Sequence, residues 1–270
     1  MRLGFRNGPT PRAVEGLAVS VHGSGPPVVM LHGQPGSAGD FDGVVAALDG
    51  AVTTLAVDRP GWGQTGGKAR SFAAQAELVA EELLARRTGP ALILGYSFGG
   101  GVALRLALDH PELVSGLLLV SSIGGAGSVT IGDSVLAAPI LGPALSLTTL
   151  AGLATAVPLV VRLTGFDALK ANLPDEVSRL SVGEVQSFVD DQRFLMRDHA
   201  ALERSVHRIG APARVLHGEL DIVVAPAAAQ ALATELAVDC ELLGDVGHLV
   251  LHQAPDRVAA TIIEMVGTAD

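Results

Sequence analysis

The chain has 270 residues with 28 acidic and 18 basic side chains, so its formal net charge is −10. Because 49% of the residues are hydrophobic, an intrinsically disordered protein is excluded, and the acidic balance argues against a nucleic-acid binder, which needs a basic surface. The single cysteine, Cys240, cannot form an internal disulfide, and no signal peptide is predicted at the start. Both features favour the cytoplasm as the location.

Seven short apolar segments predict buried β-strands, since each is rich in apolar residues and most are bounded by glycine or proline. In chain order they are 17–21, 27–31, 52–57, 91–94, 117–120, 214–216 and 241–243. Between them, helices are expected at 72–87 (with Ser71 as the N-cap), at 102–108 and at 258–266. Strands that alternate with helices predict a mostly parallel sheet with helices on both faces.

This alternation stops between residues 124 and 211, a span too long for a structureless connection inside a compact domain. We therefore expect a core formed by 1–123 and 212–270, with a helical insertion at 124–211. The segment 134–161 contains no charged residue and is long enough to cross a bilayer, but three prolines interrupt it. Burial against a ligand or protein is favoured, and membrane contact is the weaker alternative.

A nucleophile elbow is predicted at Ser97, in the segment GYSFG at 95–99. The five letters alone are weak evidence in a glycine-rich chain, but they lie between a predicted strand and a helix expected to begin near Gly100, as the elbow requires. The turn strains the serine backbone, and glycine on both sides lets neighbouring chains approach. The alternative is a glycine turn with a helix-capping serine.

The segment HGQPG at 32–36 directly follows the predicted strand 27–31. Acyl transfer needs backbone N–H donors at the developing oxyanion, one from the residue after the nucleophile and one from this earlier loop. We expect Phe98 and Gln34 to form this oxyanion hole, because Pro35 has no N–H. His32 is interpreted as a structural residue that braces the loop.

A hydroxyl nucleophile needs a base, and the base needs an orienting acid. Asp221 and His248 each follow a predicted strand, so both are expected at the carboxyl edge of the sheet, where catalytic groups gather. The predicted catalytic residues are therefore Ser97, Asp221 and His248. The competing acids and histidines are Glu219, Asp239, Asp245, His217 and His252.

Over nearly its whole length, the sequence resembles the capped serine hydrolases of the α/β-hydrolase superfamily. The resemblance rests on HGQPG, DRPGWGQTG (58–66), GYSFGG (95–100), GELD (218–221) and GDVGHL (244–249). It implies the α/β-hydrolase fold with an eight-stranded, mostly parallel sheet, a helical cap at about 124–211 and no cofactor. Epoxide hydrolases and haloalkane dehalogenases of this fold carry aspartate where this chain has Ser97, so neither activity is expected.

The aromatic residues Phe41, Trp62 and Tyr96 fall in or beside these loops. They either plug the loops over the sheet or wall an apolar substrate pocket, and we assign them to substrate binding. Leu145 and Leu153 of the uncharged segment are expected to line the same pocket.

The glycines at 61–66 also match the G-x-G-x-x-G pattern of dinucleotide sites. Such a site needs those glycines to open a helix, whereas Pro60 precedes them and a glycine–lysine segment follows, so a loop is predicted. No histidine, carboxylate or cysteine cluster has the spacing of metal ligands, and no metal is expected.

Together these features predict a cofactor-independent serine hydrolase acting on a small or medium apolar ester, thioester or lactone. One alternative uses the same triad for carbon–carbon bond hydrolysis, amide or iminopeptidase hydrolysis, or perhydrolysis. A second alternative is a non-catalytic ligand-binding protein of the same fold. A small apolar acyl substrate is the expected partner, nucleic acid is not, and a homo-oligomer is left open.

Overall fold

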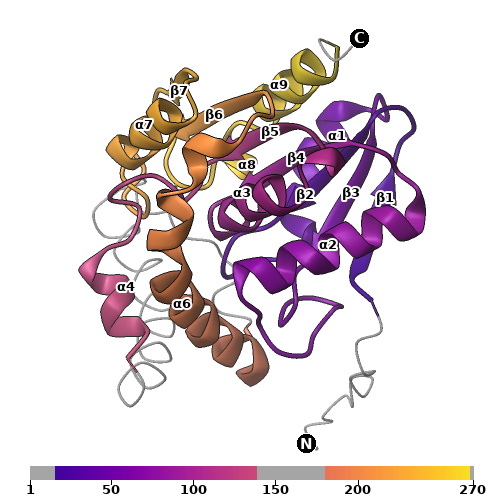
Figure 1. Cartoon of the computed structure of the whole chain (residues 1–270). Helices are drawn as coiled ribbons and strands as arrows, with labels where there is room; N and C mark the ends of the chain where they lie inside the picture. The colour runs from indigo at the N-terminus through magenta and orange to yellow at the C-terminus, as the bar shows by residue number, and fades with distance from the viewer. Residues whose placement is uncertain (1–15, 139–179, 268–270) are drawn as a thin grey trace, which may run out of the picture.

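The computed structural model of the protein describes residues 16–138 and 180–267. Within these residues, seven strands form one sheet in the order β1-β3-β2-β4-β5-β6-β7 (Figure 1). The strands are β1 (Ala18–His22), β2 (Pro27–Leu31), β3 (Thr53–Asp58), β4 (Ala91–Tyr96), β5 (Val114–Val120), β6 (Ala213–Gly218) and β7 (Cys240–Leu243). Only β1 runs antiparallel to its neighbour.

The seven predicted apolar segments correspond one to one with these strands, so the mostly parallel sheet is confirmed. The eight strands implied by the family resemblance are corrected to seven within the described part of the chain. The physical reason is that each apolar segment forms a single strand, and no described segment is left over to form an eighth.

Helices cover both faces of the sheet (Figure 1). One face carries α2 (Phe72–Arg86), α3 (Phe98–Asp109) and α7 (Pro226–Glu235). The other face carries α1 (Asp42–Leu48), α8 (Val250–Gln253) and α9 (Pro255–Gly267). The described 3-10 helices are η1 (Ala38–Phe41), η2 (Pro111–Leu113) and η5 (Val206–Arg208).

Side chains along the central strands alternate between two hydrophobic cores. In β2, Val29 and Leu31 pack into the core under α2 and α3, while Val28 and Met30 pack into the core under α1 and α9. Because both faces are buried, these strands read as continuous apolar segments rather than as alternating ones.

The predicted start of one helix is confirmed by the structure, and that of another differs from it. The side chain of Ser71 accepts a hydrogen bond from the N–H of Ala74, which confirms the predicted cap of α2. By contrast, α3 begins at Phe98, four residues before the start at Val102 that apolar periodicity predicts and two residues before the start near Gly100 that the elbow predicts. Glycines occupy positions 99–101, and their low helix propensity hides this first turn from an apolar-periodicity argument.

Between β5 and β6 the structure describes α4 (Ile131–Leu136) and α6 (Val182–Glu203), which lie side by side (Figure 1). A capping box at Ser181 begins α6. The side chain of Phe188 on α6 packs with Trp62 in a small hydrophobic cluster, so α6 is docked on the core. The cap boundaries at 124 and 211 stay a prediction. Among the described helices, none is long and apolar enough to span a membrane.

Candidate active site

Ser97 occupies a tight turn between β4 and α3. Its φ of 51° and ψ of −119° are unusual for a serine, and its N–H donates to the carbonyl of Val120 at 3.0 Å. A Cβ added at Gly95 would lie 2.6 Å from the Cα of Gly100, and one at Gly99 would lie 2.1 Å from the carbonyl oxygen of Leu31. The predicted strand–turn–helix geometry and its need for flanking glycines are therefore present.

The structure brings Ser97, His248 and Asp221 together from the carboxyl ends of β4, β7 and β6. The hydroxyl of Ser97 lies 3.0 Å from Nε2 of His248, and Nδ1 of His248 lies 2.8 Å from Oδ2 of Asp221. The exposed fractions of the three residues are only 6%, 7% and 4%. This arrangement can pass a proton from a serine to an imidazole that a carboxylate orients. The catalytic role of each residue stays a prediction.

Asp221 is held by both of its carboxylate oxygens. Oδ1 accepts hydrogen bonds from the N–H groups of Val223 and Val224, at 2.8 and 2.9 Å, and Oδ2 also lies 3.1 Å from Nε2 of His217. Burial acts to raise the pKa of Asp221, but the hydrogen bonds from His217 and His248 outweigh it and hold that pKa well below its ordinary value. The carboxylate is therefore charged at neutral pH.

His217 is the neighbour that sequence reasoning ranked only as a competing base. Its side chain is fully buried, and Nε2 also lies 2.9 Å from the carbonyl oxygen of Val224. It contacts the same oxygen, Oδ2, that His248 contacts, a role that its position four residues before Asp221 could have suggested. The other competitors, Glu219, Asp239, Asp245 and His252, are exposed.

The loop after β2 lies against the serine. A Cβ added at Gly33 would lie 3.0 Å from the Cβ of Ser97, so the backbone of this loop passes beside the nucleophile. Within the described residues, neither the N–H of Gln34 nor that of Phe98 makes a hydrogen bond. Both donors proposed from the sequence are thus uncommitted, and their role as an oxyanion hole stays a prediction.

His32 braces this loop, as interpreted from the sequence. Nδ1 donates to the carbonyl oxygen of Gly33 at 2.8 Å, and Nε2 accepts from the N–H of Arg59 at 3.0 Å. Burial, and then the charge of Arg59, lower the pKa of His32 well below its ordinary value. The ring is therefore neutral, with its proton on Nδ1.

Arg59 and Asp191 form a fully buried ion pair that sequence reasoning did not identify. Nη2 of Arg59 lies 3.0 Å from Oδ2 of Asp191, and the exposed fractions of their side chains are 1% and 0%. The indole N–H of Trp62 donates to the same oxygen at 2.9 Å. Burial raises the pKa of Asp191 to about 6 even though Arg59 opposes this shift. Arg59 belongs to the motif at 58–66, whereas nothing in the local sequence marks Asp191 on α6.

The predicted pocket residues have different environments. Phe41 and Trp62 have no exposed surface: Phe41 belongs to the core under α1 and α9, and Trp62 packs against α6. Tyr96 is nearest the site, because its hydroxyl donates to the carbonyl oxygen of His248 at 3.2 Å. A substrate contact at these three residues stays a prediction, and Leu145 and Leu153 lie outside the described residues.

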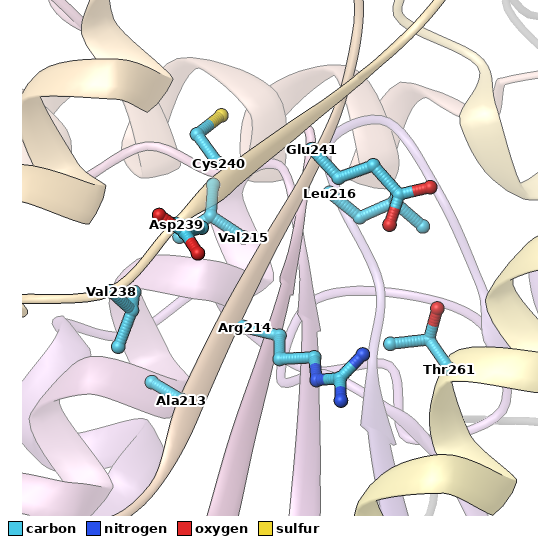
Figure 2. Close-up of a pocket in the computed structure, with 9 residues that line it drawn as sticks. All are labelled: Ala213, Arg214, Val215, Leu216, Val238, Asp239, Cys240, Glu241 and Thr261. Carbon is cyan, nitrogen blue, oxygen red and sulfur yellow. The ribbon is translucent and has the colours of Figure 1, made fainter.

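A pocket of about 550 Å³ lies away from the serine, on the amino-terminal parts of β6 and β7 (Figure 2). Its lining includes Arg214 and Glu241, which pair with Glu264 and Arg257, respectively. The lining therefore has two of its charged groups engaged in ion pairs, and its third, Asp239, is exposed. In the part of the chain that the structure describes, no group of three histidine, cysteine, aspartate or glutamate residues could hold a metal ion.

Comparison with known proteins identifies one family. The sequence model of the Alpha/beta hydrolase family matches residues 28–261. An uncharacterized protein of Mycobacterium tuberculosis is 28% identical over 282 residues, which cover 96% of this chain and 81% of that protein. A pimeloyl-(acyl-carrier protein) methyl ester esterase of Nitrosomonas europaea is 40% identical over 107 residues, 39% of this chain and 41% of the esterase.

The fold itself matches solved structures over almost its full length. A thermophilic esterase from Thermogutta terrifontis superposes with a TM-score of 0.72 at 20% sequence identity, covering 94% of this chain and 93% of the esterase. At that level of identity the similarity concerns the fold.

Proposed function

This chain belongs to the alpha/beta hydrolase family, and from that premise we propose that it is a serine hydrolase that cleaves a small or medium apolar carboxylic ester, thioester or lactone. The observation that carries the proposal is the chain of contacts from Ser97 through His248 to Asp221, at 3.0 and 2.8 Å. The partial match to methyl ester esterases supports an ester bond as the target.

The proposed reaction begins when Ser97 Oγ attacks the substrate carbonyl and His248 Nε2 takes the hydroxyl proton. Asp221 holds the imidazole by Nδ1 and stabilises its charged form. The tetrahedral intermediate then collapses, and His248 returns the proton to the leaving alcohol or thiol. A water molecule, deprotonated by the same Nε2, attacks the acyl-enzyme and releases the acid.

The negative charge that develops on the carbonyl oxygen needs donors already in place. We assign this task to the backbone N–H groups of Gln34 and Phe98. Phe98 is the first residue of α3, so the positive end of the helix dipole adds to its effect. The glycine at position 33 allows this loop to approach Ser97 closely.

The test uses a fluorophosphonate probe and p-nitrophenyl esters of increasing chain length. Ser97→Ala should abolish labelling and leave the protein folded. It should reduce kcat by at least ~10³-fold, because only substrate binding and the oxyanion hole then contribute to catalysis. Ser128→Ala is the matched control: Ser128 is also buried and its Oγ also lies near a histidine nitrogen, 2.7 Å from Nε2 of His199.

Labelling that persists in Ser97→Ala, or that disappears in Ser128→Ala instead, would refute the assignment of the nucleophile. Amide and diketone substrates run in parallel separate ester hydrolysis from the other reactions open to the same triad. A wild-type protein that binds esters without turning any of them over would instead support a ligand-binding protein.

A further inference from the structure

The peptide group that joins Gly33 to Gln34 is held by its carbonyl oxygen. Gly33 O accepts two hydrogen bonds, one from Nη2 of Arg59 at 2.7 Å and one from Nδ1 of His32 at 2.8 Å. Nε of Arg59 also donates to the preceding carbonyl, that of His32, at 2.8 Å. One guanidinium therefore holds two successive carbonyl groups of the loop beside Ser97.

The position of that carbonyl determines where the next N–H points. The Gly33–Gln34 peptide is trans, and in a trans peptide the C=O and N–H vectors are opposed across one rigid plane. With Gly33 O directed at Arg59, the N–H of Gln34 is directed away from Arg59. This N–H is the proposed loop donor of the oxyanion hole, so its orientation depends on what holds Gly33 O.

Arg59 also contacts the residue that supplies the other donor. Its guanidinium carbon lies 4.5 Å from the ring centroid of Phe98, above the ring. Nη1 donates to Oε1 of Gln75 on α2 at 3.2 Å. The planar fork of an arginine matches several acceptors in one plane, which a lysine ammonium on a flexible stem does not reproduce.

The charge of this buried arginine is balanced from a distant part of the chain. Asp191 on α6 supplies the carboxylate, 132 residues along the sequence from Arg59, and Trp62 donates to the same oxygen. An arginine this deeply buried keeps its geometry only with its counter-ion in place, because an isolated buried charge is strongly unfavourable. The docking of α6 is thereby linked to the loop beside Ser97.

We propose that Arg59 is a positioning residue for the oxyanion hole, and that Asp191 makes this positioning depend on the docking of α6. The proposal rests on the proposed serine hydrolase function. A buried ion pair that only attached α6 to the core would change stability, whereas a positioning residue changes kcat per active site and the affinity for a transition-state analogue.

Two variants separate these roles. Arg59→Lys keeps the charge opposite Asp191 but removes the planar fork. The double variant Arg59→Met/Asp191→Asn removes both charges together and leaves an acceptor for Trp62, so it should fold even where a single change does not. Arg105→Lys is the matched control, since Arg105 pairs with Asp109 at the surface.

Active sites are first counted by the end point of fluorophosphonate labelling, and kcat and KM are then measured with p-nitrophenyl butyrate. Both variants should lose at least ~10-fold in kcat per active site with KM within about threefold, because a donor is misdirected while the acyl pocket is unchanged. Affinity for phenylboronic acid, whose tetrahedral and anionic adduct with the serine places a boron-bound oxygen in the oxyanion hole, should fall by a similar factor. Arg105→Lys should match the wild type.

A double variant that folds and keeps kcat and phenylboronic acid affinity within twofold of wild type overturns the proposal. If neither of these variants folds, Asp191→Asn alone decides: its kcat per active site should fall at least threefold, and an unchanged value overturns the link to α6. Failure of the function itself looks different, because the wild type would then neither hydrolyse esters nor be labelled at Ser97.

Discussion

Replacing Asp221 by asparagine converts one of its two oxygens into an NH2 group, and the surrounding contacts determine which one. Oδ1 accepts hydrogen bonds from the backbone N–H groups of Val223 and Val224, so the amide oxygen must stay at that position. The new NH2 group then faces His248, where Oδ2 stood 2.8 Å from Nδ1. It donates to Nδ1 and forces the imidazole proton onto Nε2.

In that tautomer, Nε2 of His248 points an N–H at Ser97 and cannot accept the serine proton. The same loss of the correct tautomer lowers kcat about 10⁴-fold in a serine protease triad, so we expect a decrease of ~10³- to 10⁴-fold, or about 4–5.5 kcal/mol of transition-state stabilisation. KM should change less than about threefold, because both carboxylate oxygens of Asp221 are already engaged by protein groups, Oδ1 by two backbone N–H groups and Oδ2 by His248 and His217.

The assay is steady-state hydrolysis of p-nitrophenyl butyrate at pH 7, with thermal melting to verify that each variant is folded. Asp245→Asn and Glu219→Gln are the matched controls, because both acids lie in neighbouring loops but are exposed. The reasoning fails if Asp221→Asn retains more than a tenth of the wild-type kcat, or if either control loses activity instead.

Two further predictions concern stability. Gly99→Ala should lower the free energy of unfolding, measured by urea denaturation, by ~1–3 kcal/mol or more, because its Cβ would meet the backbone oxygen of Leu31 at 2.1 Å. Gly66→Ala, at φ +56° with open space around it, should lower it by only ~1 kcal/mol. Equal losses in the two variants would contradict the steric argument. Burial raises the pKa of Asp191 to about 6, so the folded state binds this proton more tightly than the unfolded state, in which the carboxyl has an ordinary pKa near about 3.9. The resulting stabilisation is fully present below about pH 3.9 and is lost as the pH rises through about 6. Between pH 4 and 7 the free energy of unfolding of Asp191→Asn, measured in urea, should therefore gain up to ~3 kcal/mol relative to wild type, and a difference independent of pH would count against a buried acid at this position.

Much of the fold could be predicted because its signals are local. A strand buried on both faces is apolar along its whole length, so β2 and β4 stand out in the sequence, and the N-cap at Ser71 involves only one turn of α2. Apolar periodicity missed the first turn of α3, because its glycines serve close contacts with Leu31 and Ser122 rather than helix propensity.

Burial is harder to infer from a local pattern. Phe41 and Trp62 lie in predicted loops beside the motifs, a pattern that fits equally a plug over the sheet or a wall of a substrate pocket. The structure places both side chains fully inside packed clusters. An aromatic residue in a loop can cover a core or line a ligand site, and only its neighbours in space distinguish the two.

The sequence by itself determined the seven strands and the turn at Ser97, and it predicted Asp221 and His248 at the same edge of the sheet, because strand ends and glycine turns place such residues there. The competing acids and histidines stayed open until the structure showed which of them meet at Ser97. Only the tertiary structure decided that His217 supports the acid and that Asp191 balances Arg59 beside the loop at Gly33. These contacts depend on which strands are neighbours and on how α6 docks. Non-local packing sets both, and residues 132 apart in the chain leave no shared pattern in the sequence.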